Sequence, residues 1–135
     1  MKRVIFACPD NAGRSQMAAA LFNALAHPHL ASAVCAGVAP AERILPAVMI
    51  VMAEAGIDLT PEEPKLLSDT IARTADLLIT VGCPDACPFV PEDRRDEWPL
   101  RDPDGQPLEV VRAIRDELRA RVVRLLAANG WQSSS

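Results

Sequence analysis

The sequence has no excess of positive charge, no long hydrophobic run and no tyrosine. Its 135 residues include 14 lysines and arginines against 18 aspartates and glutamates, a formal net charge of −4. This balance leaves no basic field to attract nucleic acid or an anionic membrane surface. No apolar run reaches the roughly 20 residues of a membrane-spanning helix. An anionic substrate would therefore have to be bound locally, by a few well-placed donors.

The amino terminus has basic residues before a short apolar run, but Pro9 and Asp10 end that run too early for a secretory signal. A cytoplasmic location is therefore expected, where thiols stay reduced. In that setting the four cysteines are predicted to be catalytic, redox-active or metal-binding rather than a disulfide framework. The length predicts a single domain over residues 1–131, followed by a disordered tail at 132–135.

Short apolar runs alternate with helical patterns along the chain. Strands are predicted at residues 3–7, 30–36 and 77–81, with a brief fourth strand near 97–100. Helices are predicted at 15–27, where Ser15 is available as the cap, at 43–55, from Ser68 onward, and at 108–129. This alternation predicts a single-domain α/β sandwich of three layers, with a parallel sheet flanked by helices.

A cysteine loop connects the first strand to the first helix. Cys8 and Arg14 are separated by five residues, and Ser15 follows directly. Backbone N–H groups before a helix bind anions, and an arginine fork binds two oxygens at once. The predicted oxyanion-binding residues are Pro9, Asp10, Asn11, Ala12, Gly13 and Arg14. The same surroundings predict a Cys8 pKa lowered to roughly 3.5–7.5, with Ser15 donating to the sulfur.

The alternative interpretation of this loop is purely structural, with Cys8 as a small buried residue and Arg14 as a solvated one. We favour a functional, anion-binding loop because the motif lies between a buried strand and a helix, the context that anion binding requires. In parallel sheets, ligands bind at the carboxyl ends of the strands. Cys83 lies two residues past the third strand, so the two thiols would share one edge of the sheet if their strands are neighbours.

The stretch from Cys8 to Ala18 resembles the active-site loop of the low-molecular-weight tyrosine phosphatase superfamily. Its Ser-Gln-Met-Ala continuation is similar to that of the arsenate reductase branch. Residues 55–59, 82–88 and 98–105 resemble three further segments of that branch. The resemblance covers most of the chain. It implies a four-stranded parallel sheet and an enzyme that uses Cys8 as nucleophile against an arsenate- or phosphate-type oxyanion.

The resemblance also implies roles for residues on two later segments. An aspartate before a proline acts in the family as general acid, which corresponds to Asp102, with Asp104 as the nearby competitor. Cys83 and Cys87 resemble the redox cysteines, which would resolve a Cys8–arsenic adduct through a disulfide relay. They could also be inert thiols or half of a zinc site, although the two histidines are remote from them in sequence.

The reductant implied by the resemblance is an external thiol, with no bound cofactor and no metal. Thioredoxin is one candidate. The compact Cys83-to-Cys87 spacing resembles instead members that use mycothiol with a glutaredoxin-like partner, and Gly13 stands where thioredoxin-coupled members often have a cysteine. The leading prediction is therefore a thiol-dependent arsenate reductase.

Two other functions are weighed against arsenate reduction. The first is a tyrosine phosphatase that hydrolyses phosphoesters through a phospho-cysteine. Against it, Asp104 stands where such phosphatases usually have an aromatic residue. The second is a binding module that only senses the anion. The retained thiol argues against it, since binding needs only the amides and Arg14.

Overall fold

Four parallel strands form the centre of the molecule. The structure is a computed structural model that describes residues 1–82 and 94–133. Its strands are β1 (Lys2–Cys8), β2 (Ala31–Gly37), β3 (Leu77–Val81) and β4 (Arg95–Trp98), in the spatial order β2-β1-β3-β4. All neighbouring pairs run parallel. The predicted four-stranded parallel sheet is confirmed, and β1, which carries Cys8, lies inside it.

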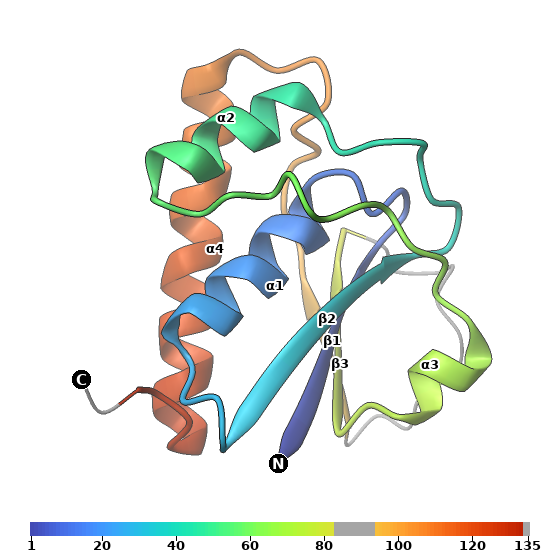
Figure 1. Ribbon diagram of the computed structural model, residues 1–135, viewed down its shortest axis with the longest axis vertical. Helices are drawn as coiled ribbons and strands as arrows, with labels where there is room; N and C mark the ends of the chain where they lie inside the picture. The colour runs from blue at the N-terminus through green and yellow to red at the C-terminus, as the bar shows by residue number, and fades with distance from the viewer. Residues whose placement is uncertain (83–93, 134–135) are drawn as a thin grey trace.

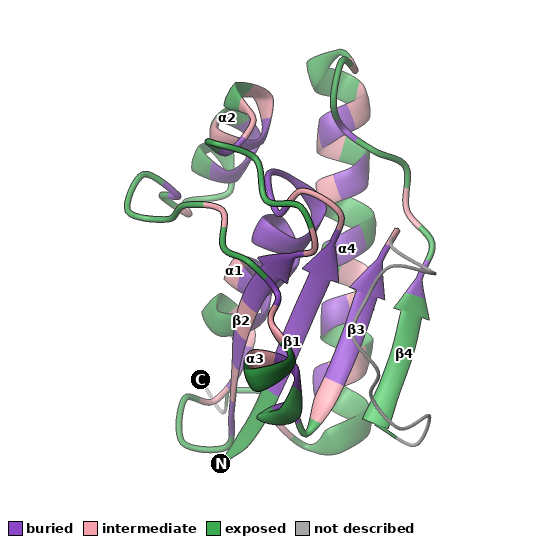
Figure 2. Cartoon of the chain, turned by 90° about the vertical axis from the view of Figure 1, so that its right-hand side faces the viewer, coloured by how far each residue is buried: buried purple, intermediate pink, exposed green. Residues whose placement is uncertain are grey.

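Helices cover both faces of the sheet. They are α1 (Arg14–Leu25), α2 (Pro46–Glu54), α3 (Asp69–Arg73) and α4 (Leu108–Asn129). Helices α1, α2 and α4 lie on one side of the sheet and the short α3 on the other (Figures 1 and 2). This arrangement is the predicted three-layer α/β sandwich.

Strand β1 is buried on both faces, and its side chains alternate between two cores. Val4 and Phe6 contribute to the large core beneath α1 and α4, whereas Ile5 and Ala7 pack in the smaller core beside α3. All four side chains have no solvent exposure. This is why the sequence of β1 is continuously apolar rather than alternating.

Four aromatic residues of the described chain form one chain of contacts through the large core. Phe6 packs against Trp98 at 5.4 Å and against Phe22 at 6.0 Å between ring centroids, and Phe22 packs against Trp131 at 6.3 Å. The Phe6–Phe22 and Phe22–Trp131 pairs are edge-to-face, an arrangement that aromatic quadrupoles favour. These contacts connect β4, β1, α1 and the segment after α4.

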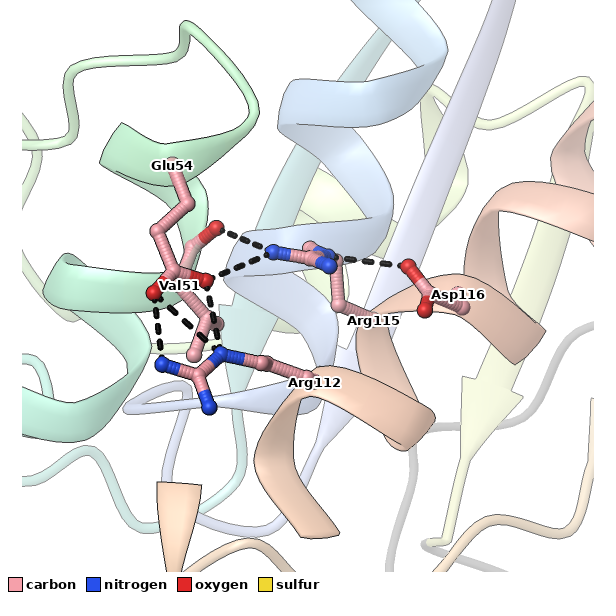
Figure 3. Close-up of polar contacts among 5 residues, drawn as sticks. All are labelled: Val51, Glu54, Arg112, Arg115 and Asp116. Carbon is pink, nitrogen blue, oxygen red and sulfur yellow. Dashed lines mark hydrogen bonds and ion pairs between the residues drawn. The ribbon is translucent and has the colours of Figure 1, made fainter. Parts of the chain in front are cut away.

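An exposed ion-pair network joins α2 to α4 (Figure 3). Arg112 donates to both Glu54 carboxylate oxygens, with Nη2 to Oε2 at 2.8 Å. Arg115 donates to the Val51 carbonyl oxygen at 2.8 Å and to Glu54 at 3.1 Å, and it also pairs with Asp116. Exposed pairs contribute little stability individually. The guanidiniums satisfy acceptors at the carboxyl end of α2, where positive charge is favourable.

Element boundaries agree with the sequence analysis in some places and differ in others. The Ser68 hydroxyl caps α3 by accepting from the Ile71 N–H at 3.1 Å, as expected. Helix α2 begins only at Pro46, because proline suits the first helical position. Strand β4 begins at residue 95 rather than near 97. The prediction that Ser15 caps the first helix is wrong, because α1 begins at Arg14 and no side chain caps it.

The carboxyl-terminal segment stays attached beyond α4. Gly130 ends that helix in the left-handed conformation, with φ 68°. Gln132 then forms an antiparallel bridge with Ala26, and the Ser133 N–H donates to the Leu25 carbonyl oxygen at 3.1 Å. Gln132 and Ser133 are therefore tied to the end of α1 and are not part of the tail predicted at 132–135. Within the described part of the chain, no helix is long and apolar enough to cross a membrane.

We predict that Phe22→Ala destabilises the protein by about 3–5 kcal/mol, because it removes a fully buried ring that contacts two other aromatic side chains. Urea unfolding followed by circular dichroism measures this change. Val123→Ala, at a position 47% exposed on α4, is the control and should change the unfolding free energy by less than about 0.5 kcal/mol. Equal losses in both variants would contradict this assignment of the core.

Candidate functional site

Cys8 ends β1 and points into the loop that precedes α1. Its side chain has no solvent exposure. The sulfur lies 2.8 Å from the Ser15 hydroxyl oxygen and accepts the Asn11 backbone N–H at 3.2 Å. This contact between Cys8 and Ser15 agrees with the expectation that Ser15 donates to the sulfur. It explains why Ser15 does not cap the helix, because its hydroxyl is directed at the sulfur.

The shape of the loop depends on Asn11, which is fully buried. It is the one non-glycine residue of the described chain with positive φ, at 52°, a conformation that asparagine tolerates. Its amide nitrogen donates to the Ser15 hydroxyl at 2.7 Å. Its side-chain oxygen accepts the Lys65 backbone N–H at 2.8 Å and the Gln16 amide at 3.2 Å.

Burial raises the pKa of the Cys8 thiol above its ordinary value. Hydrogen bonds from Ser15 and Asn11 act in the opposite direction, and the Asp10 carboxylate adds to the increase. The prediction of a lowered pKa is therefore wrong for this structure. The physical reason is desolvation, because a thiolate loses more water on complete burial than these few hydrogen bonds replace.

Arg14 is buried, with 7% exposure, and its guanidinium is held at the carboxyl ends of β3 and β4. It donates to the Leu100 carbonyl oxygen at 2.8 Å. Gly82 provides the room: a Cβ there would overlap the guanidinium, with the Arg14 Cζ only 2.7 Å away. Gly82 has φ 75°, so a side chain would be unfavourable for two separate reasons.

Asp102 lies near Arg14 on the loop that follows β4. Its Oδ2 is 3.9 Å from the Arg14 Nη2, and its side chain is 56% exposed. Its Oδ1 accepts the Asp104 backbone N–H at 3.0 Å. The loop rests on the cysteine loop at Gly13, where a Cβ would come within 2.8 Å of the Pro103 ring. Glycine at this position permits the close approach that brings Asp102 beside Arg14.

A cavity opens beside these residues among the parts of the chain that the structure describes. It has a volume of about 650 Å³, and its lining consists of Arg14, Thr80, Gly82, Glu97, Trp98, Pro99 and Leu100. That volume is within the range of small-molecule sites. In residues 1–82 and 94–133, no group of three or more His, Cys, Asp and Glu side chains is arranged to hold a metal ion.

From the predicted set, the structure places Cys8 against Ser15 and Arg14 near Asp102. Cys83 and Cys87 lie outside the described residues. Gly82 was not predicted as a site residue, although its position directly before a predicted redox cysteine could have indicated it. The Leu100 carbonyl oxygen was not predicted either, and no sequence pattern marks it, because every residue has a backbone oxygen.

Comparison with known proteins identifies the family of this chain. The model of the low molecular weight phosphotyrosine protein phosphatase family matches residues 3–133. The chain belongs to this family. A relative from Synechocystis sp., named glutaredoxin arsenate reductase, is 34% identical and aligns over 94% of this chain and 98% of its own. A putative arsenate reductase from Halobacterium salinarum is 37% identical over 89% of this chain and 87% of its own.

A solved structure has the same fold. The thioredoxin-dependent arsenate reductase of Corynebacterium glutamicum superposes with a TM-score of 0.81 at 34% identity over 95% of this chain. This chain spans 61% of the length of that protein. The resemblance to the arsenate reductase branch of the phosphatase family is thus confirmed at the level of sequence and fold.

We predict that Ser15→Ala raises the Cys8 pKa further, because it removes the hydroxyl that lowers this pKa by hydrogen bonding to the sulfur. The thiolate would then form only at higher pH. The rate of Cys8 alkylation by iodoacetamide, followed against pH by peptide mass spectrometry, should rise at a higher pH than in the unmodified protein. Ser32→Ala, on β2, should leave this profile unchanged, and a profile shifted to lower pH by Ser15→Ala would contradict the assignment.

Gly82→Ala should abolish detectable phosphate binding, because the added methyl group displaces the Arg14 guanidinium. Gly56→Ala is the matched control, since Gly56 also has positive φ, at 79°, but has nothing within 4 Å of an added Cβ. Both variants should lose about 1–2 kcal/mol from the left-handed backbone. Calorimetric titration with phosphate distinguishes them, and equal phosphate affinities would show that Arg14 does not need the space at Gly82.

Proposed function

We propose that this protein reduces arsenate to arsenite at the Cys8 loop. The observation that carries the proposal is a buried thiol held at the amino terminus of α1, 2.8 Å from the Ser15 hydroxyl, in a chain 34–37% identical to arsenate reductases over most of its length. The N–H groups in the first turn of a helix have no intrahelical acceptors. They are therefore available to a tetrahedral oxyanion that binds against the sulfur.

In the first step, the Cys8 sulfur attacks arsenic and forms a sulfur–arsenic bond. The bound arsenate dianion is an oxygen base beside the thiol and takes the thiol proton, which offsets the raised Cys8 pKa. One arsenic–oxygen bond breaks, and the oxygen leaves as water with a proton from Asp102. Arg14 neutralises the charge on the remaining oxygens, as its buried guanidinium next to Asp102 supports.

In the second step, another thiolate attacks the Cys8 sulfur. A sulfur–sulfur bond forms, the sulfur–arsenic bond breaks, and its electron pair reduces arsenic(V) to arsenic(III), which leaves as arsenite. We propose Cys83 for this role. Cys87 would then attack Cys83 in the Cys8–Cys83 disulfide, forming a Cys83–Cys87 disulfide and releasing Cys8 as a thiol. Gly82, the residue directly before Cys83 in the sequence, lies against the Arg14 guanidinium. The segment that carries the second thiol therefore begins beside the proposed oxyanion site, which supports this role.

The final disulfide would be reduced by an external thiol system, so that no bound cofactor is needed. The relatives support two routes, since one is named for glutaredoxin and another is described as thioredoxin-dependent. In a mycothiol route, the Cys8 adduct would be resolved by the small thiol, and Cys87 would not be required.

Phosphoester hydrolysis is the alternative function, because the family model is that of a phosphotyrosine phosphatase and the same loop geometry suits a phosphoryl group. Here water rather than a second thiol would attack the Cys8 adduct. The residue after Pro103 is the exposed Asp104, which offers no ring to pack against a tyrosine side chain and would repel an anionic phosphopeptide.

The decisive assay incubates the reduced protein with arsenate and either a thioredoxin system or mycothiol with a glutaredoxin-like partner, and measures arsenite. Cys8→Ser should abolish arsenite formation while phosphate binding is retained. Cys35→Ala, at a buried cysteine of β2, is the matched control and should keep activity within a few-fold. Mass mapping of the oxidised product separates the routes, because only the intramolecular relay produces a Cys83–Cys87 disulfide.

Hydrolysis of p-nitrophenyl phosphate is measured on the same samples. Strong hydrolysis without arsenite under either thiol system would contradict the reductase proposal and favour the phosphatase. Arsenite formation by Cys8→Ser at the rate of the unmodified protein would exclude Cys8 as the nucleophile.

A further inference from the structure

The oxyanion loop contains a carboxylate of its own. Asp10 is the second residue after Cys8, and its side chain is half-buried. Its Oδ1 lies 3.7 Å from the Cys8 sulfur, which donates to it, and accepts the Ala12 backbone N–H at 3.2 Å. An acceptor group thus lies among donors whose proposed purpose is to bind an anion.

The position of this carboxylate is held by the backbone around it. The Asp10 carbonyl oxygen accepts the Ala41 N–H at 2.9 Å, and the Pro9 carbonyl oxygen accepts the Ala39 N–H at 2.9 Å. None of the ion pairs formed within residues 1–82 and 94–133 involves Asp10. Within that part of the chain, its negative charge is therefore not neutralised by a paired cation.

An ionised carboxylate can only accept hydrogen bonds. An oxyanion that enters the loop next to Asp10 would meet an acceptor, which is favourable only if the oxyanion carries an O–H group directed at it. Two facing acceptors without a proton between them repel each other and leave both groups desolvated. Binding next to the Asp10 carboxylate therefore favours an anion that carries an O–H group over one that carries none.

We propose that Asp10 is a specificity-determining residue that selects oxyanions carrying at least one O–H group. Arsenate and phosphate meet this condition at neutral pH, because both of their ionic forms retain a hydroxyl. Sulfate does not, and neither does the dianion of a phosphomonoester. The inference rests on the proposed oxyanion site, and it supplies a physical reason for that site to prefer free arsenate over a phosphoester.

Sulfate and hydrogen phosphate form a suitable pair of probes, because they share shape and charge and differ in one proton. The reduced full-length protein is titrated with sodium phosphate and with sodium sulfate at pH 7 and equal ionic strength, and the two dissociation constants are measured by calorimetry. The unmodified protein should bind phosphate about tenfold or more tightly than sulfate, since a site that requires a hydrogen-bond donor rejects an analogue lacking it.

The test variant is Asp10→Asn, which keeps the shape of the side chain and an oxygen for the Ala12 N–H but adds an N–H₂ donor. Sulfate should bind about tenfold more tightly to this variant while phosphate binds equally or less well, so that the ratio of the two constants approaches one. Glu42→Gln is the charge control, since Glu42 is exposed on the neighbouring segment. It should keep the ratio of the unmodified protein, and thermal unfolding checks that both variants fold.

Three results would overturn the inference: equal binding of both anions by the unmodified protein, an unchanged ratio in Asp10→Asn, or equal tightening of both anions in that variant. The last would show simple charge repulsion rather than a required proton. If neither anion binds to any variant, the oxyanion site fails and the proposed function fails with it. Normal phosphate selectivity without arsenite formation would instead reject the reductase reaction and leave the role of Asp10 intact.

Discussion

The buried side chain of Asn11 fixes the loop between Cys8 and the first helix. Its single amide group donates to the Ser15 hydroxyl, accepts from the Lys65 backbone and accepts from Gln16. These bonds fix a left-handed turn that a larger or branched residue could not adopt without strain. Because the turn directs the Asn11 N–H at the sulfur of Cys8, both the Cys8 thiol and the loop that follows it depend on this one residue.

The thiol at the centre of the site is subject to opposing effects. Complete burial and the Asp10 carboxylate favour the neutral form, whereas Ser15 and the loop amides favour the thiolate. Desolvation has the larger effect here. Burial therefore favours a protonated sulfur, and in the proposed reaction the dianionic substrate supplies the base that takes its proton.

Much of the fold follows from local patterns. The apolar runs of β1 and β3 and the spacing in α4 predict these elements because burial on one or two faces is a property of each segment alone. Cys8, Arg14 and Ser15 could be predicted as a site for a similar reason, since a short loop between a strand and a helix brings them together. The position of β4 was less predictable, because a short edge strand with three exposed residues has no hydrophobic pattern to mark its ends.

The sequence by itself determined the sheet, the helices around it and the thiol loop, because each depends on residues close together in the chain. Tertiary structure alone decided what surrounds that loop. Pro103 fits only because Gly13 lacks a side chain, and Arg14 reaches the Leu100 carbonyl only because Gly82 leaves room. The elevated Cys8 pKa is likewise a tertiary effect, since the layers that exclude water from the sulfur come from distant parts of the sequence.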